Sequence, residues 1–167
     1  MQIQTPSFRR LAAGLALALC APLAAAQVVL YGAPIDLETA KKIAAGAVAE
    51  ARKNNFTMVV AITDGAGDLV YLEKMDGTQT ASVKVAEGKA RSAAIFKRPT
   101  KVFQDIVAGG GDGLRILGLD GAVPIEGGIP LVVGGKIIGA IGASGGSASQ
   151  DGQVAKAGAA VVMPPAN

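Results

Sequence analysis

The sequence predicts an α+β fold, in which an antiparallel sheet is flanked by helices. Two pairs of apolar, β-branched segments are each joined by a short glycine-containing turn, as hairpins are: 56–63 with 68–75, and 129–135 with 136–144. Segments with the 3.6-residue periodicity of amphipathic helices come before, between and after these pairs. Strands that arrive as hairpins form antiparallel sheets, so the helices are expected to pack on the sheet rather than to alternate with parallel strands.

Residues 1–26 are interpreted as a secretory signal peptide. Arg9-Arg10 precede an apolar run of about ten residues, and small residues end at Ala26, as in a cleavable signal. The run is too short for a transmembrane helix. The protein is therefore expected to be periplasmic or secreted, by the general or the twin-arginine route. Lipoprotein processing at Cys20 is disfavoured by Leu19 before it.

Loss of this leader changes the composition that bears on function. The chain has 16 basic and 13 acidic residues, and the leader holds two of the basic ones, so the mature chain is close to neutral. This balance argues against a nucleic-acid partner. Cleavage of the leader also removes the single cysteine, and the chain has no histidine. A Ser-His-Asp triad, a conventional zinc site and a proximal haem histidine are thereby excluded, and no catalytic residue is assigned.

The mature chain is long enough for one domain with one core. We assign residues 27–35 to an N-terminal segment, 36–163 to the domain and 164–167 to a tail. The first element is a helix that Asp36 caps and that ends near Asn54-Asn55.

The hairpin 56–63 and 68–75 follows, with DGAG as its turn. Ser82 then opens a helix that Pro99 stops, because the residue before a proline avoids the helical region. Thr100 is expected to cap a short helix that ends at the glycines of 109–113.

The last third contains three expected strands, at 122–126, 129–135 and 136–144. The final helix begins at Ser147, where Ser147 and Gln150 have the spacing of a capping box.

The glycine-rich stretch GASGGSASQDGQ (142–153) has two interpretations. A dinucleotide-binding loop is excluded, because no second parallel strand and no acidic residue follow at the required distance. The N–H groups of the last helix, with Ser144, Ser147 and Ser149, could bind a carboxylate or phosphate. The favoured alternative is that small residues here let strand and helix pack closely.

A second candidate anion site is Lys97-Arg98-Pro99-Thr100. Two cations at one helix end, a hydroxyl and the free N–H groups of the next helix are expected to converge there. The alternative is an ordinary capped corner between helices. A lysine such as Lys89 would become reactive if it were buried, but the sequence does not show burial.

Three stretches in this order resemble the GlcG/HbpS family of small haem-binding-like proteins: VVAITDGAGDLVYLEKMDG, ASVKVAEGKARSAAIFKRPT and PIEGGIPLVVGGKIIGAIGASGGSASQDGQVAKAG. The resemblance covers about residues 36–162, nearly all of the mature chain. It implies a profilin-like or roadblock-like domain with a five-stranded antiparallel sheet, and homo-oligomers, often octamers. It also implies haem or tetrapyrrole binding, redox or iron handling, and an association with glycolate utilisation.

The resemblance implies haem as the cofactor and directs attention to residues that could hold it. Lys97, Arg98, Thr100 and Arg91 are the candidates for the propionates and the cofactor edge, and Met75 is the most available axial ligand. Four other residues could serve as conventional ligands but are expected to be less available than Met75: Met58, Met163, Tyr31 and Tyr71. Without histidine, haem binding is expected to be weak or labile.

The leading hypothesis is therefore an exported, oligomeric haem- or tetrapyrrole-binding protein, in haem or iron scavenging or redox sensing, and a binding protein rather than an enzyme. The alternative is a protein that binds or processes a small carboxylate of the glycolate type. A structural assembly without ligand is a third hypothesis.

Overall fold

The computed structural model describes residues 29–163 together with Gln2. The rest of the predicted signal peptide, residues 27–28 and the predicted tail 164–167 lie outside the described residues. No helix in the described part of the chain is long and apolar enough to cross a membrane.

The sheet is built around its longest strand, β5 (Lys136–Ser144). β5 pairs antiparallel with β4 (Gly128–Val133) on one edge and with β2 (Val59–Asp64) on the other, and β2 continues into its hairpin partner β3 (Leu69–Lys74). β1 (Leu30–Tyr31) runs parallel to the start of β5 at Lys136 and Ile137. The α+β class is confirmed, and β1, β3 and β4 each pair with one strand only.

The fifth strand is not the one expected from the sequence. Residues 122–126 form no strand, and two of their N–H groups bond to side chains: Val123 to Ser92 Oγ at 3.1 Å and Glu126 to Gln104 Oε1 at 2.8 Å. Pro124 also has no N–H to donate to a ladder. β1 takes the fifth place, so the sheet contains one short parallel pair and is not wholly antiparallel.

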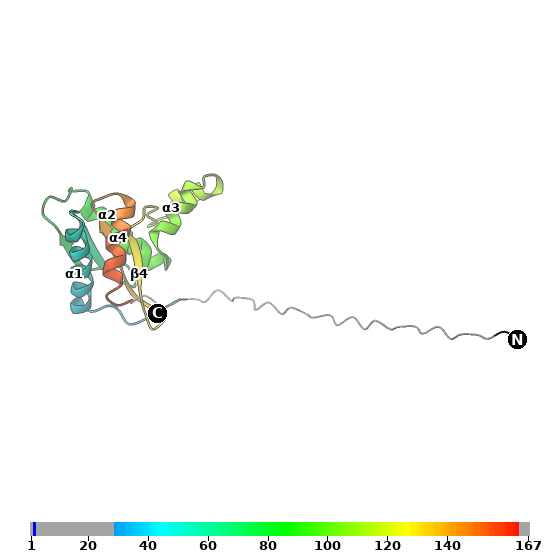
Figure 1. Ribbon diagram of the computed structural model, residues 1–167, viewed down its shortest axis with the longest axis horizontal. Helices are drawn as coiled ribbons and strands as arrows, with labels where there is room; N and C mark the ends of the chain where they lie inside the picture. Colours follow the sequence, from blue (N-terminus) through cyan, green and yellow to red (C-terminus); the bar gives the residue numbers. More distant parts are fainter. Residues whose placement is uncertain (1, 3–28, 164–167) are drawn as a thin grey trace.

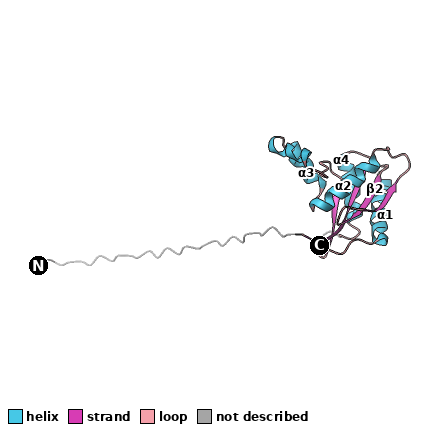
Figure 2. Ribbon diagram, turned by 180° about the vertical axis from the view of Figure 1, so that it is seen from behind, coloured by secondary structure: helices cyan, strands magenta, loops and turns pink. Residues whose placement is uncertain are grey.

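Helices cover both faces of the sheet (Figures 1 and 2). α1 (Leu37–Lys53) and α4 (Ala148–Ala159) lie side by side on one face, and α2 (Ser82–Phe96) lies on the other. The alternation of β2 explains this arrangement, because Val60 and Ile62 enter the core under α1 and α4 while neighbouring residues of β2 pack against α2.

Very small residues let these layers approach closely. A Cβ at Gly142 of β5 would overlap the backbone carbonyl of Ala86 in α2. A Cβ at Gly158 of α4 would lie 3.0 Å from the Cβ of Ala47 in α1. The contact at Gly142 agrees with the favoured interpretation that small residues in 142–153 let strand and helix pack closely, whereas Gly158 brings two helices together.

Most helices begin and end where the sequence predicts. Asp36 Oδ1 accepts a hydrogen bond from the N–H of Thr39 at 2.7 Å, and α1 ends at Asn54. The capping box of Ser147 and Gln150 is present at the start of α4. Thr100 is the exception to the expected caps.

α3 (Thr100–Ala108) has Pro99 at its N-cap, and Thr100 is already helical. The Thr100 hydroxyl is buried and accepts a hydrogen bond from the N–H of Gly128 at 2.9 Å. The expected cap is therefore wrong, because this hydroxyl fastens the start of β4 to α3 instead of closing a helix end.

α3 and the 3-10 helix η1 (Gly111–Gly118) form an arm that projects from the body (Figure 1). α3 ends at the glycines where the sequence predicts a stop, but η1 was not expected. None of the residues of η1 is buried, and the arm exposes several large apolar side chains: Val102, Ile106, Leu114, Leu117 and Leu119.

Candidate functional site

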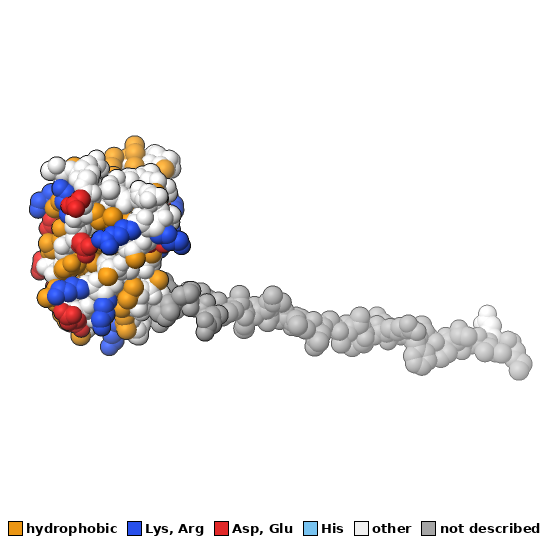
Figure 3. Space-filling model, turned by 60° about the vertical axis from the view of Figure 1, so that its left-hand side comes forward, with side chains coloured by type: hydrophobic (Ala, Val, Ile, Leu, Met, Phe, Trp, Pro, Cys, Tyr) orange, Lys and Arg blue, Asp and Glu red, His pale blue; other side chains and the backbone are white. Residues whose placement is uncertain are grey.

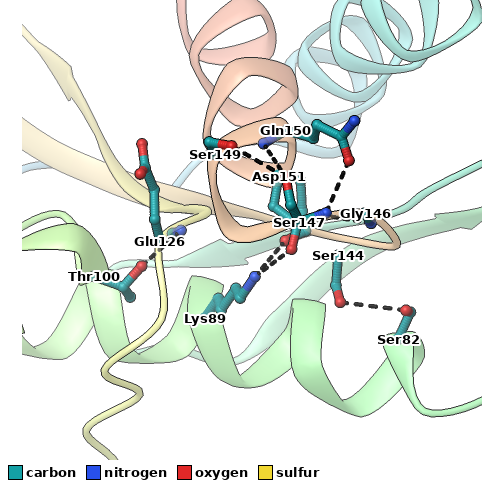
Figure 4. A network of polar contacts seen from close by, with 12 residues as sticks. Ser82, Lys89, Thr100, Glu126, Ser144, Gly146, Ser147, Ser149, Gln150 and Asp151 are labelled. Atoms are coloured by element: carbon teal, nitrogen blue, oxygen red, sulfur yellow. Dashed lines mark hydrogen bonds and ion pairs between the residues drawn. The ribbon is translucent and has the colours of Figure 1, made fainter. Parts of the chain in front are cut away.

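A buried ion pair joins the two helical layers (Figure 4). Lys89 Nζ of α2 lies 2.6 Å from Asp151 Oδ2 of α4 and donates a second hydrogen bond to the carbonyl of Ala143, at 3.1 Å. Both side chains are almost completely buried. Asp151 also accepts a hydrogen bond from the N–H of Gly146 at 3.0 Å. Burial of a charge without a partner is very costly, so each of these two charges is held in place by the other.

The segment Glu126-Gly127-Gly128 passes directly over this pair. The carbonyl of Gly127 accepts from the N–H of Ala143 at 2.9 Å, and a Cβ at Gly127 would lie 2.9 Å from Lys89 Nζ. Gly128 is fixed by the Thr100 hydroxyl. Because its neighbours are clamped in this way, the Glu126 side chain points away from the ion pair (Figure 4).

The N-terminus of α4 is already occupied by side chains of the same chain. The Ser147 N–H donates to Gln150 Oε1 at 2.9 Å, and the Ser147 and Ser149 hydroxyls are 3.0 Å apart. Ser144 is buried and donates to Ser82 Oγ at 3.3 Å, on the α2 side. The structure therefore keeps Ser147 and Ser149 together but places Ser144 elsewhere, as Figure 4 shows.

Three adjoining hollows follow β4, and we call them together the β4 groove. Their volumes are about 350, 340 and 240 Å³, and all three are lined by Ile129. The first and third share Pro99, and the second and third share Met163. The remaining apolar side chains of the lining are Val29, Val102, Pro130, Val132, Ile137, Ala159 and Ala160. This combined volume is in the range of small-molecule sites.

Three lysines border the β4 groove. Lys101 pairs with Asp105 at 2.7 Å, and Lys156 lies 3.3 Å from Glu126 Oε1. The hydrogen bond that Lys101 donates to the Asp105 carboxylate raises the pKa of the Lys101 ammonium above its ordinary value, so Lys101 stays charged at neutral pH. Lys97 Nζ donates to the carbonyl of Val29 at 3.0 Å and lies 4.4 Å from the centre of the Tyr31 ring.

The predicted corner at Lys97-Arg98-Pro99-Thr100 does not gather its polar groups at one point. Lys97 reaches towards Val29, whereas Arg98 donates to the carbonyl of Phe96 at 3.0 Å and lies over the ring of Phe103. The Thr100 hydroxyl is buried. Of this set only Lys97 and Pro99 line the β4 groove, and the binding roles of Arg98 and Thr100 stay predictions.

Met75 and Arg91 lie apart from the groove. Met75 packs against the core near the C-terminal end of α1, in a hollow that it shares with Arg52 and Asp76. Arg91 reaches the turn of the β2–β3 hairpin, where it lies 3.8 Å from Asp68. The structure does not bring these two candidates together with Lys97.

Three residues of the groove were missed from the sequence, Lys101, Glu126 and Lys156, and a fourth, Met163, was expected to be a less available ligand. The i, i+4 spacing of Lys101 and Asp105 was a visible signal, because such pairs share one helix face. The contact of Lys156 with Glu126 joins residues 30 positions apart and gives no local pattern. Among the described residues, no group of three His, Cys, Asp or Glu side chains could hold a metal ion.

The chain is similar in sequence and fold to several known proteins. Protein GlcG of Escherichia coli strain K12 is 40% identical over 110 residues, which cover 66% of this chain and 81% of that protein. The crystal structure of a double mutant of Streptomyces reticuli HbpS superposes with a TM-score of 0.72 and is 30% identical, covering 85% of this chain and 97% of the other.

The crystal structure of a PduOC:haem complex superposes with a TM-score of 0.70 and 28% identity, covering 77% of this chain and 95% of the other. The model of the family described as "Haem degrading protein HbpS-like" matches residues 35–160. With this match over most of its length, the chain belongs to the HbpS-like family.

Proposed function

We propose that this protein binds haem or a related tetrapyrrole in the β4 groove. The observation that carries the proposal is the groove itself, in which three adjoining hollows with largely apolar lining are bordered by Lys97, Lys101 and Lys156. The family description and the haem complex of PduOC support haem as the ligand.

The side chains of the groove fit the two parts of haem. Pro99, Ile129 and Val132 offer apolar contact to the faces of the macrocycle, while lysine ammonium groups are suitable partners for propionates. Bound haem would supply a redox-active iron. Because the chain has no histidine, the iron must be held without an imidazole, and binding is expected to be labile.

A haemin titration tests the proposal. A saturable shift of the Soret band is expected for the wild type at micromolar protein. Replacing Lys97 or Lys156 by alanine should raise the Kd about two- to fivefold, as expected for exposed charge pairs. Lys84→Ala is the matched control, since Lys84 pairs with Glu87 at 3.0 Å on α2 and does not line the groove.

The result that overturns the proposal is a wild type without any saturable shift. If Arg98→Ala weakens binding and the lysine variants do not, haem binds at the helix corner and the groove is wrong. Small hydroxy acids belong in the same screen, because the lysines suit carboxylates too. Thermal stabilisation by millimolar glycolate without any haem response would favour the carboxylate alternative.

We also propose that the protein acts after export, as a homo-oligomer, in haem or iron scavenging or in redox sensing. The basic pair and apolar run of residues 1–26 support export. A mature N-terminus at Gln27, found by mass spectrometry of periplasmic or secreted protein, is the expected result. An unprocessed chain in the cytoplasm would contradict it.

The arm supports self-association. Leu114 and Leu117 are 50% and 63% exposed on an element that buries none of its own residues. Exposed apolar patches of this kind mark interfaces. Light scattering should show an oligomer, with an octamer as the family expectation, that Leu114→Ser with Leu117→Ser dissociates. A wild-type monomer would contradict the proposal.

A further inference from the structure

We propose that Met163 provides the axial sulfur ligand for haem iron in the β4 groove. This inference rests on the proposed function and goes beyond it, since it names one atom, Sδ of Met163, as the group that holds the iron. Met163 was expected from the sequence to be less available than Met75. In the structure, Met163 lines the candidate site and Met75 does not.

Met163 lies where two hollows of the groove meet. It lines both the hollow bordered by Lys156 and the hollow bordered by Lys97. Met163 therefore lines the same hollows as two of the three bordering lysines, Lys156 and Lys97. A ligand that uses these two cations at once would have its apolar body beside Met163.

The sulfur atom is also held in a defined orientation. The N–H of Val132 donates a hydrogen bond to Met163 Sδ, with a distance of 3.2 Å. Val132 follows an irregularity in the register of β4 with β5, and its N–H is satisfied by the thioether. A thioether sulfur has two lone pairs, so this bond leaves one for a metal and fixes its direction, as outer hydrogen bonds do for metal ligands.

The other conventional ligands are engaged elsewhere. Met58 is fully buried in the core, and Met75 lies in a different hollow. Tyr31 Oη donates to the carbonyl of Ala94 at 3.0 Å, and Tyr71 Oη donates to Glu73 at 3.2 Å. Among the described residues that line the groove, Met163 alone carries sulfur, and none carries an imidazole or a phenol.

A thioether ligand has a consequence that distinguishes it from lysine or carboxylate ligands. Sulfur of methionine is a soft donor, and methionine ligation raises the reduction potential of haem iron. The groove should therefore bind ferrous haem more tightly than ferric haem. A carboxylate ligand, such as Glu126, would give the opposite preference.

The test compares haem titrations of the wild type, Met163→Leu and Met75→Leu under oxidising and reducing conditions. Met163→Leu should raise the Kd for ferrous haem about 10- to 100-fold, the range seen when metal sites lose supporting groups. It should also lower the midpoint potential and change the visible spectrum. Met75→Leu should leave all three unchanged. Melting temperatures of the ligand-free proteins show whether each variant is folded.

Met163→His is the second variant, and it keeps the test informative even if leucine destabilises this end of the chain. An imidazole at the position of an iron ligand should give tighter ferric binding and a histidine-type spectrum. Wild-type affinity, spectrum and potential in both Met163 variants would overturn the role of Met163 and leave haem binding by the groove intact. Absence of saturable binding in the wild type would overturn the proposed function itself.

Discussion

The body and the arm of this protein differ in how many of their side chains are buried. In the body, a sheet lies between helices whose buried contact residues are mostly alanine and glycine, and Ile43 of α1 and Ile141 of β5 are completely buried. In the arm, η1 buries none of its residues and several leucines face outward. The face shown in Figure 3 carries acidic and basic side chains interspersed among apolar ones.

The contrast indicates where stability and interaction are located. In the body, the buried charges of Lys89 and Asp151 are partners of one another within the chain. In the arm, α3 buries only Thr100 and Phe103 and η1 buries none of its residues, so these helices draw little stability from packing within the chain. We therefore expect substitutions in the body to change the free energy of unfolding and substitutions in the arm to change association.

The largest effect should come from breaking the buried ion pair. Lys89→Met leaves the Asp151 carboxylate buried without its cation, which should lower the free energy of unfolding by about 3–5 kcal/mol. Urea denaturation measures this loss. The double variant Lys89→Met with Asp151→Leu should recover much of it, since no charge is then left unpaired.

The exposed Lys84 provides the control for that substitution. Lys84→Met should change the free energy of unfolding by no more than about 0.5 kcal/mol. An equally small effect of Lys89→Met would show that the buried pair does not hold the two helical layers together.

A smaller effect is expected from adding one methyl group between β5 and α2. Gly142→Ala places a Cβ against the backbone of Ala86, which cannot move without shifting the helix. The variant should lose about 1–3 kcal/mol of the free energy of unfolding. Gly88→Ala is the matched substitution, because its Cβ would meet only Val123 Cγ2 at 3.5 Å and alanine favours a helix. Destabilisation by Gly88→Ala as large as by Gly142→Ala would contradict this explanation.

The last prediction concerns local opening of the arm, which changes global stability least. Amide hydrogen exchange measures this opening and should separate the arm from the body most clearly. Amides of α3 and η1 should exchange faster than those of α2 in dilute protein, because local opening of the arm exposes little buried surface. Protection of the arm should increase with protein concentration if a second copy covers it. Slow exchange in the arm at every concentration would mean that the arm is stable within one chain.

Local patterns of the sequence predicted most of the fold. The periodicity of α1, the two hairpins and the capping box at Ser147 are short-range features, and the structure contains each of them. The prediction of a strand at 122–126 was wrong, because β propensity cannot show whether a neighbour is available to pair. The two residues of β1 were too few to carry any pattern.

The candidate site was predicted much less completely. Lys97 was recognised because cations at a helix end are visible in the sequence, and Lys97 does line the groove. Glu126, Lys156 and Met163 were assigned no binding role or a minor one, since each gains its importance from a residue distant in sequence.

The sequence by itself therefore determined the α+β class, the order of most elements and the family, because periodicity, turn residues and matching stretches are local properties. Only the tertiary structure decided that Lys89 meets Asp151 across 62 residues, and that Met163 meets Val132 across 31. The physical reason is that a charge or a sulfur atom has no preferred partner along the chain. Packing of helices against the sheet selects the partner, and it is this packing that opens a groove beside β4.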